Sequence, residues 1–140
     1  EVVNDMYNKC LLEMQCCTMF DYIRLLDTRI QRMQGSDGAK VIKMNFGMAI
    51  MALKAGFPIR RSGWNGKGLM VFKQVPAHID SDIIPKMQSI PQSAKDLILK
   101  GKGFIDYTSQ CLIYNENTGR ADSWVPSISD VFAEDWEIVE

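Results

Sequence analysis

The sequence predicts an α+β fold in which a small antiparallel sheet packs against a helix and follows an N-terminal helical extension. Apolar residues recur every three or four positions over residues 2–34, which is the spacing of an amphipathic helix. Short runs typical of strands follow, with turns between them. The order of helix, hairpin, insertion, hairpin, turn and strand therefore favours an antiparallel sheet with a helix on one face.

Length and composition fit a soluble protein with one domain, or with one domain and an appendage. The chain has 140 residues, of which 46% are hydrophobic and 24% charged. Its net charge of −1, from 16 basic and 17 acidic residues, argues against general binding to nucleic acid. No apolar stretch approaches the roughly 18 to 20 residues of a membrane span, and residues 1–5 lack the features of a signal peptide. We therefore expect no nucleic acid or membrane as partner, and a cytosolic setting.

The cysteines and the single histidine predict no metal or cofactor. Cys16 and Cys17 are adjacent, Cys10 and Cys111 stand apart, and no Cys/His cluster has the spacing of a zinc site. We expect the four cysteines to be small buried apolar residues. His78 has no partner at the spacing of a metal site or a triad, so we expect it to be a surface loop residue.

The first part of the chain is expected to be helical. The apolar pattern fits either one long helix or two helices with a break between Thr18 and Asp21. A glycine-containing break at 35–38 separates a helical extension, residues 1–38, from a main domain, residues 44–140. In that domain Asn45 is a suitable N-cap, and Gly56 a suitable C-terminal stop, for a helix of about three turns.

A hairpin and an insertion are expected next. The runs 57–61 and 69–73 predict two strands around a glycine-rich turn at 62–68. An insertion at about 76–103 contains a short helix, which Ser93 would cap.

The C-terminal part is expected to complete the sheet. Residues 104–108 and 111–114 predict the two strands of a second hairpin. The remaining predicted elements are a turn at 115–120, an extended piece at 123–125, a helical turn at 127–133 capped by Ser127 or Ser129, and a strand at 136–139.

The turn from Gly63 to Gly68 is the first candidate for chemistry. Its glycines permit positive φ and a close approach of a ligand to the backbone, and exposed amides in such a turn bind anions. Lys67 adds a cation, Trp64 offers a face for stacking a base, and Asn65 suits a base edge or a ribose hydroxyl. On spacing alone, a hairpin turn whose Trp64 covers the core is the better explanation. The run also lacks the spacing of a Walker loop.

The run at 123–130 is the second candidate. Pro126 before Ser127 suits a strand-to-helix turn, and free amides at a helix start bind phosphate or carboxylate. Asp130 could accept a hydrogen bond from a ribose hydroxyl or an adenine amine, or it could simply cap the helix. Trp136 is better explained by core packing.

These motifs together resemble the second type of the phage Thoeris anti-defence sponge family. The blocks that carry the resemblance are Met44-Asn45-Phe46-Gly47, Ala52-Leu53-Lys54-Ala55-Gly56, Arg61-Ser62-Gly63-Trp64-Asn65-Gly66-Lys67-Gly68, Pro126-Ser127-Ile128-Ser129-Asp130 and Ala133-Glu134-Asp135-Trp136-Glu137-Ile138-Val139. The resemblance covers about residues 44–140, apart from 76–103, where no motif matches. Residues 1–43 have no counterpart in it.

The resemblance implies a small α+β protein that assembles as a homotetramer in the cytoplasm of the infected bacterium. Members of the family bind cyclic ADP-ribose isomers made by TIR-domain defence proteins and hold them intact, so that the effector is never activated. For some members the resemblance also implies binding of cyclic dinucleotides at a separate site. Carried over to this chain, the expected ligand-binding residues are Phe46, Arg61, Trp64, Asn65, Gly66, Lys67, Gly68, Trp124, Pro126, Ser127 and Asp130.

Two other functions stay open on the sequence. An enzyme could hydrolyse the same nucleotide with Asp130 or Asp135 as general base, but no metal cluster or second histidine supports it, so we expect a binding protein and not an enzyme. A phage structural or interaction protein would use Trp64 and Trp136 only as core residues. The extension could brace the oligomer, cover a second site or bind a partner, and we prefer the first because its apolar stripe needs a partner surface.

Overall fold

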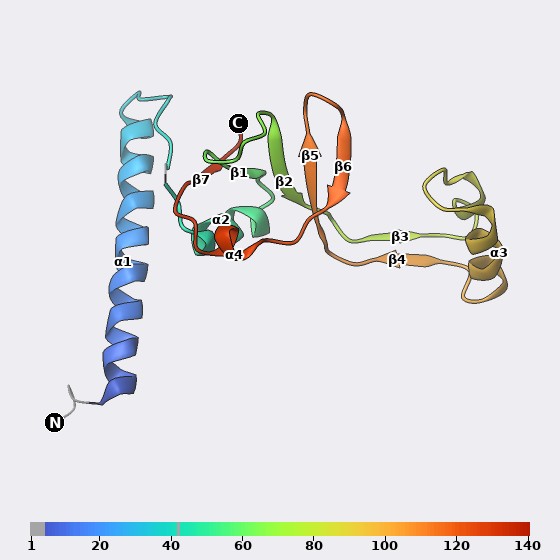
Figure 1. The fold of residues 1–140 in the computed structure, drawn as a ribbon, viewed down its shortest axis with the longest axis horizontal. Coiled ribbons are helices and arrows are strands. Elements are labelled where there is room, and N and C mark those ends of the chain that lie inside the picture. Colours follow the sequence, from blue (N-terminus) through green and yellow to red (C-terminus); the bar gives the residue numbers. More distant parts are fainter. Residues whose placement is uncertain (1–4, 42) are drawn as a thin grey trace.

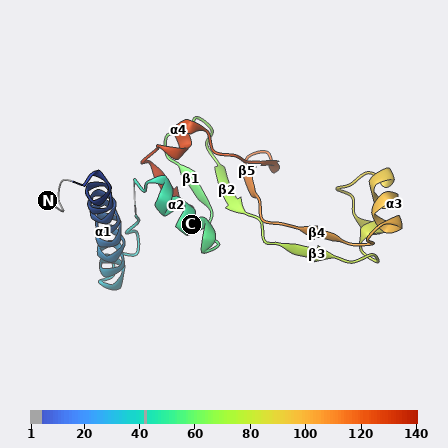
Figure 2. The same cartoon turned by 90° about the horizontal axis from the view of Figure 1, so that it is seen from below.

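A computed structural model describes residues 5–41 and 43–140 and contains the expected α+β fold. A long helix, α1, stands at one end of the molecule, and a five-stranded antiparallel sheet lies in the middle (Figure 1). A two-stranded arm leads away from the sheet to a short helix at the other end, and the view from below gives the same order (Figure 2). The sheet region therefore connects two outlying parts.

Helix α1, Met6–Met33, is unbroken, so of the two alternatives left open by the sequence the single long helix is the one formed. Residues 2–4 of the predicted helix lie outside the described residues. The helix meets the sheet region along one side, where Asp21 accepts a hydrogen bond of 2.9 Å from the Asn45 amide and Arg24 donates one of 2.7 Å to the Lys43 carbonyl. No described side chain of α1 is buried, and its N-terminal half extends past the rest of the molecule (Figure 1).

Helix α2, Phe46–Lys54, begins and ends where its sequence predicts. The Asn45 side chain accepts a hydrogen bond of 2.9 Å from the Met48 N–H, so it is the N-cap. Gly56 has a φ of 91°, the left-handed conformation that stops a helix and that glycine adopts without strain. Both predicted helix ends are therefore confirmed.

The five-stranded sheet has the order β6-β5-β2-β1-β7. Its strands are β1 (Ile59–Arg61), β2 (Leu69–Lys73), β5 (Cys111–Asn115), β6 (Arg120–Ser123) and β7 (Trp136–Ile138). Ile59 pairs with Val71 and with Ile138, and alternation along the strands places Ile59 and Val71 in the core under α2. Trp136 is fully buried in this core, as its sequence context predicts. The predicted β1–β2 hairpin is confirmed.

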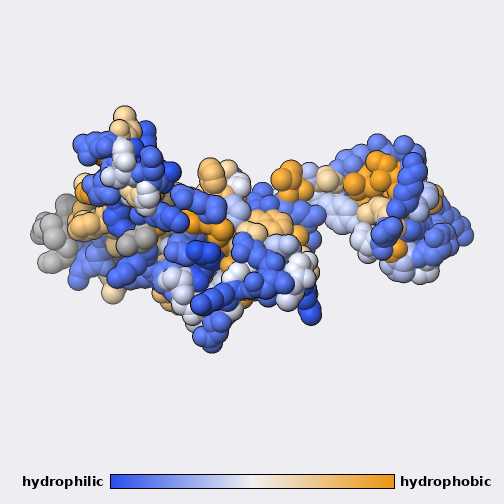
Figure 3. Space-filling model, turned by 90° about the horizontal axis from the view of Figure 1, so that it is seen from above, coloured by the Kyte–Doolittle hydropathy of each residue, from blue (hydrophilic) through white to orange (hydrophobic). Residues whose placement is uncertain are grey.

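The insertion forms the arm. Its elements are β3 (Ala77–Ile79), the 3-10 helix η2 (Ile84–Lys86), α3 (Gln92–Lys100) and β4 (Ile105–Tyr107). Strand β4 pairs with β3 and not with β5, so the predicted second hairpin is wrong; β5 pairs with β2 and β6 instead. Ser93 does not cap α3, because Pro91 takes the N-cap position and the helix begins at Gln92. Figure 3 shows hydrophobic residues gathered over the far end of the arm.

The prediction that the cysteines are buried is also wrong. Cys10, Cys16 and Cys17 are exposed, and Cys111 is half-buried. The first three lie on α1, which contacts the sheet region along a single side and leaves the others to solvent. Within the described residues, no helix is long and apolar enough to cross a membrane.

Candidate ligand-binding site

The glycine-rich turn between β1 and β2 borders a surface cavity of about 330 Å³. The residues that line it are Arg60, Arg61, Ser62, Trp64, Gly66, Lys67, Gly68, Leu69 and Glu137. Three of these side chains are cationic and one is anionic, but Arg60 and Arg61 are paired with carboxylates, which leaves Lys67 as the cation of the lining without an ion pair among the described residues. Arg61, Trp64, Gly66, Lys67 and Gly68 are among the predicted ligand-binding residues, and the fold brings them together here.

Two contacts with the β5–β6 turn hold the loop in place. The Asn117 amide donates a hydrogen bond of 2.7 Å to the Lys67 carbonyl, and the Glu116 N–H donates one of 2.8 Å to the Gly68 carbonyl. Gly68 has a φ of 79°, and a Cβ there would lie 2.8 Å from the Asn117 amide nitrogen. The positive φ therefore favours glycine at position 68, and a Cβ there would also displace the Asn117 amide that binds the Lys67 carbonyl.

Several polar groups of the loop have no protein partner. Within residues 5–41 and 43–140, no hydrogen bond is found for the backbone N–H groups of residues 65–68, and no ion pair for the Lys67 ammonium. Asn65 is exposed beside them. Arg60, in contrast, binds Glu137 at 2.6 Å. The loop thus offers one uncommitted cation and a series of uncommitted amides, which is a combination that binds anions.

Asp130 does not line the cavity but binds two residues that do, Arg61 and Trp64. Its Oδ1 accepts hydrogen bonds from the Arg61 guanidinium at 3.0 Å and from the Trp64 indole at 3.1 Å. Its Oδ2 accepts from the Ser127 N–H at 2.9 Å and from the Ser127 hydroxyl at 2.8 Å. Ser127 also caps helix α4, Ile128–Val131, as predicted. Asp130 is 7% exposed, and both of its carboxylate oxygens already accept hydrogen bonds from the protein.

Asp135 shares Arg61 with Asp130. Its Oδ1 accepts from the Arg61 Nε at 2.8 Å, and its Oδ2 accepts from the Gly63 N–H at 2.8 Å. Hydrogen bonds to the two carboxylates raise the pKa of Arg61, and the bond from Arg61 lowers the pKa of Asp135. Burial alone would raise the pKa of Asp130, but bonds from Ser127, Arg61 and Trp64 outweigh burial and lower it to about 2. Both carboxylates are therefore charged at neutral pH and are weak bases.

Three other aromatic residues pack around Trp136. Ring centroids lie 5.7 Å away for Phe46, 5.4 Å for Trp64 and 6.1 Å for Trp124. Phe46 and Trp124 thus belong to the edge of the core and do not line the cavity, and neither does the half-buried Pro126. Trp64 belongs to both, because it contacts Trp136 and borders the cavity.

Sequence reasoning missed Arg60, Glu137 and the structural role of Asp135. Arg60 lies opposite Glu137 in the β1–β7 register, and this pairing brings Glu137 to the cavity from the other end of the domain. The available signal was the opposite charge of Arg60 and Glu137 on two predicted strands. That signal can be used only when it is known that these two strands pair.

His78 lies in strand β3 and not in a loop, although it is exposed as predicted. Its Nδ1 faces Asp106 and its Nε2 faces Asp80 at 3.1 Å. The hydrogen bond with Asp106 raises the pKa of His78, and both aspartate charges add to the rise. Because both ring nitrogens face carboxylates, this arrangement favours an imidazolium and not a general base. Among the described residues, no group of three or more His, Cys, Asp or Glu could hold a metal ion.

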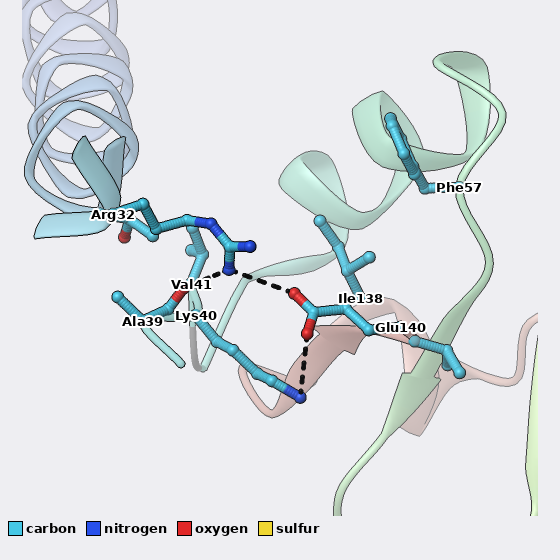
Figure 4. A pocket seen from close by; sticks show the side chains of 9 residues that line it. Arg32, Ala39, Lys40, Val41, Phe57, Ile138 and Glu140 are labelled. Carbon is cyan, nitrogen blue, oxygen red and sulfur yellow. Dashed lines mark hydrogen bonds and ion pairs between the residues drawn. The ribbon is translucent and has the colours of Figure 1, made fainter. Parts of the chain in front are cut away.

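A second cavity, of about 350 Å³, lies where α1 meets the sheet region (Figure 4). Arg32 points from α1 toward Glu140, with 3.3 Å between Nη1 and Oε1, and Lys40 approaches the other carboxylate oxygen at 3.7 Å (Figure 4). None of the predicted ligand-binding residues lines this cavity. We therefore place the candidate site at the β1–β2 turn.

The fold and the cavity define a small α+β domain with a cavity beside a glycine-rich turn. The model of the Thoeris anti-defense 2-like domain matches residues 44–139. A curated relative, Thoeris anti-defense 2 of Bacillus phage SP01, is 34% identical over 102 residues, which cover 69% of this chain and 96% of that protein. The chain belongs to the Thoeris anti-defense 2-like family. Helix α1 lies before the matched range.

Replacing Asp130 should change both the stability and its dependence on pH. The folded pKa of about 2 lies below the ordinary value of 3.8, so the carboxylate stabilises the fold above pH 4, and this stabilisation is lost as the pH falls through 2. It amounts to about 2 kcal/mol. In urea unfolding followed by tryptophan fluorescence, we expect Asp130→Asn to have a lower free energy of unfolding than wild type at pH 7. On acidification, the free energy of unfolding of the variant should fall by about 2 kcal/mol less than that of wild type. The exposed Asp82→Asn control should behave as wild type, and an Asp130→Asn variant with the wild-type acid profile would contradict the assignment.

The titration of His78 can be measured directly, because it is the only histidine in the sequence. We expect NMR to give a pKa of His78 above the ordinary 6.5. The stabilisation from the charged pair is then present below pH 6.5 and is lost as the pH rises through the raised pKa. Asp106→Asn should remove most of the rise, and Asp80→Asn a smaller part. A pKa at or below 6.5 in the wild-type protein would refute the pairing.

Proposed function

We propose that this chain counters bacterial Thoeris defence by binding a cyclic ADP-ribose-type signal and holding it intact. Membership of the Thoeris anti-defense 2-like family supports the target of the inhibition. The observation that carries the binding proposal is the cavity at the β1–β2 turn, where an uncommitted lysine lies beside uncommitted backbone amides. The site of action is the cytoplasm of the infected bacterium.

The chemistry of the cavity suits the pyrophosphate of such a signal. Lys67 and the N–H groups of residues 65–68 are the donors that we assign to the phosphate oxygens. Arg61 is held by two carboxylates, so we assign it to fixing the cavity wall and not to binding the phosphate. Trp64 is half-buried and borders the cavity, so part of its indole is available to a base or a ribose.

The size of the cavity favours a site completed by a second subunit. Small-molecule sites commonly measure about 300–1,000 Å³, and 330 Å³ is at the low end of that range. Competition with an effector at low signal concentration requires a dissociation constant near nanomolar, which corresponds to a binding free energy of about −12 kcal/mol. An open site rarely reaches this affinity. We therefore retain the homotetramer as part of the proposal, with a neighbouring subunit closing the cavity. Binding of cyclic dinucleotides at a separate site is retained as a further prediction.

The roles of Asp130 and Ser127 become indirect in this proposal. The Ser127 hydroxyl donates a hydrogen bond to Asp130, and Asp130 also accepts from Arg61 and Trp64. We therefore assign Asp130 and Ser127 to positioning the cavity wall. Phe46 and Trp124 have a similar role through Trp136. Direct contact of these four residues with the ligand stays a prediction.

Hydrolysis of the signal finds little support in the charges of the site. A general base works best with a pKa near the working pH, whereas the pKa of Asp130 is about 2 and that of Asp135 is also lowered. A ligand-free structural protein is the remaining candidate, since Trp64 packs on the core as that function expects. The uncommitted Lys67 favours a ligand instead.

The first test asks whether the signal survives. The protein is incubated with a panel of cyclic ADP-ribose isomers, separated from free ligand and denatured by heat, and the released compound is identified by mass spectrometry. We expect an unchanged cyclic isomer in stoichiometric amount. Linear ADP-ribose in the released fraction would favour the hydrolase, and no retained compound would favour the structural protein.

The second test compares two lysines. Lys67→Ala removes the uncommitted cation of the cavity, and a hydrogen bond to a charged group contributes about 1.5–3 kcal/mol. We expect the dissociation constant of the bound isomer to rise roughly 10- to 100-fold in isothermal titration calorimetry, with little change in thermal stability. Lys73→Ala is the matched control, because Lys73 is exposed at the end of β2 and does not line the cavity. Equal affinities for both variants would place the ligand elsewhere.

A further inference from the structure

From Leu12 to Met33, helix α1 carries an uninterrupted heptad repeat of apolar residues. They follow one another at alternating spacings of four and three: Leu12, Cys16, Met19, Ile23, Leu26, Ile30 and Met33. In heptad notation, Cys16, Ile23 and Ile30 occupy the a positions, and the other four occupy the d positions. Helices with this repeat associate with a helix that carries the same repeat.

This a/d stripe faces away from the sheet region. Met19 and Ile23 are each 55% exposed, and Leu26, at 38%, is also exposed. The side chains of α1 that meet the sheet region include Asp21, Arg24, Leu25, Thr28 and Arg32. They occupy heptad positions b, c and f, which lie on the opposite side of a helix from a and d. The contacts of α1 within the chain therefore leave the stripe uncovered.

We propose that α1 pairs with α1 of a second copy of this chain as a parallel two-stranded coiled coil. The residue types favour this arrangement over other coiled coils. β-Branched residues at a with unbranched-Cβ residues such as leucine at d favour parallel dimers. Here Ile23 and Ile30 are at a, and Leu26 is at d between them.

The surface of α1 has the shape that such a partner fills. A shallow apolar depression of about 140 Å³ is lined by Cys16, Met19, Phe20 and Ile23. These residues occupy a, d, e and the following a, the four positions that surround a d-position knob from the facing helix in a parallel pair. In an in-register pair, the knob that enters this depression is Met19 of the second copy.

The area available matches a stable interface. The stripe residues are joined by Phe20 and Tyr22 at the flanking e and g positions, which are 68% and 65% exposed. Burying on the order of 80 Å² for each of these side chains removes roughly 1,400 Å² from solvent over both helices. Stable protein interfaces bury about 1,200–2,000 Å².

The charges of α1 disfavour a lipid surface as the alternative partner. Helices that lie on membranes carry a polar face rich in lysine and arginine. Outside the a and d positions, α1 carries both signs: Arg24, Arg29 and Arg32 against Glu13, Asp21 and Asp27. Mixed charges suit the solvent-facing side of a helix pair.

Cysteine cross-linking of the full chain tests the pairing, its direction and its register. One variant keeps only Cys16, at position a, and a matched variant keeps only Cys17, at position b; the other cysteines become serine. Facing a positions in a parallel pair come within the about 4.4–6.8 Å Cα separation that a disulfide needs, whereas b positions lie on the outside. After mild oxidation we expect most of the Cys16 variant, and little of the Cys17 variant, to run as a covalent dimer on a denaturing gel.

A second pair of variants shows whether the apolar stripe causes the cross-link. In the Cys16-only background, Met19→Glu places a charge in the stripe, and Met14→Glu places the same charge at position f of the same helix. Met14 and Met19 are 61% and 55% exposed, so both substitutions start from exposed methionines. We expect Met19→Glu to reduce cross-linking at least 10-fold and Met14→Glu to leave it unchanged, with far-ultraviolet circular dichroism confirming that both variants fold.

The outcomes separate the possible partners of α1. Cross-linking through Cys16 that Met19→Glu abolishes supports the parallel pair. Equal cross-linking of the Cys16 and Cys17 variants would show random collision and overturn it. A Cys16 variant that stays monomeric would overturn it as well, and flotation of this variant with anionic vesicles would then assign the stripe to a lipid surface. None of these results depends on whether the cavity at the β1–β2 turn binds a signal.

Discussion

The Asp130 carboxylate joins two segments that are far apart in the sequence, residues 61–64 and the turn that begins at Ser127. The carboxylate accepts hydrogen bonds from Arg61 at the end of β1, from Trp64 in the glycine-rich turn and from Ser127 at the start of α4. The backbone carbonyl of Asp130 accepts a further hydrogen bond of 3.0 Å from the Trp136 indole. A buried carboxylate is tolerated only when it has such partners, and each donor would be left unsatisfied without it. The position of the cavity wall therefore depends on a group that does not itself line the cavity.

This arrangement separates the charges that hold the site from the charge that is left for a ligand. Arg61 is neutralised by Asp130 and Asp135, and Arg60 by Glu137, so these pairs are part of the folded structure. Lys67 projects from a loop whose conformation is set by Gly68 and by the Asn117 contact. An anion that binds here gains a cation without breaking an existing ion pair, which is the condition for tight binding at low cost in reorganisation.

Most features that depend on neighbouring residues were predictable from the sequence, although the Ser93 cap was not, and the wrong predictions of pairing and burial depend on distant residues. Asn45, Gly56 and Ser127 end or begin helices because of interactions within a few residues, and all three assignments are confirmed. The pairing of β4 was wrong because β3, hidden in an irregular insertion, competes with β5 as its neighbour. The burial of Cys16 was wrong for a related reason, since a helix pattern does not say which side has a partner.

The two faces of α1 make the extension and the cavity physically independent. Polar contacts such as Arg24 with the Lys43 carbonyl fix the helix to the sheet region, while the a/d stripe lies on the other side. In a parallel pair the b, c and f positions point outward, so each sheet region lies on the outside of the pair. The pairing then leaves the β1–β2 turn uncovered, and a subunit that closes the cavity has to do so through the sheet region. An oligomer built from both contacts would use two different surfaces, which is the requirement for an assembly larger than a dimer.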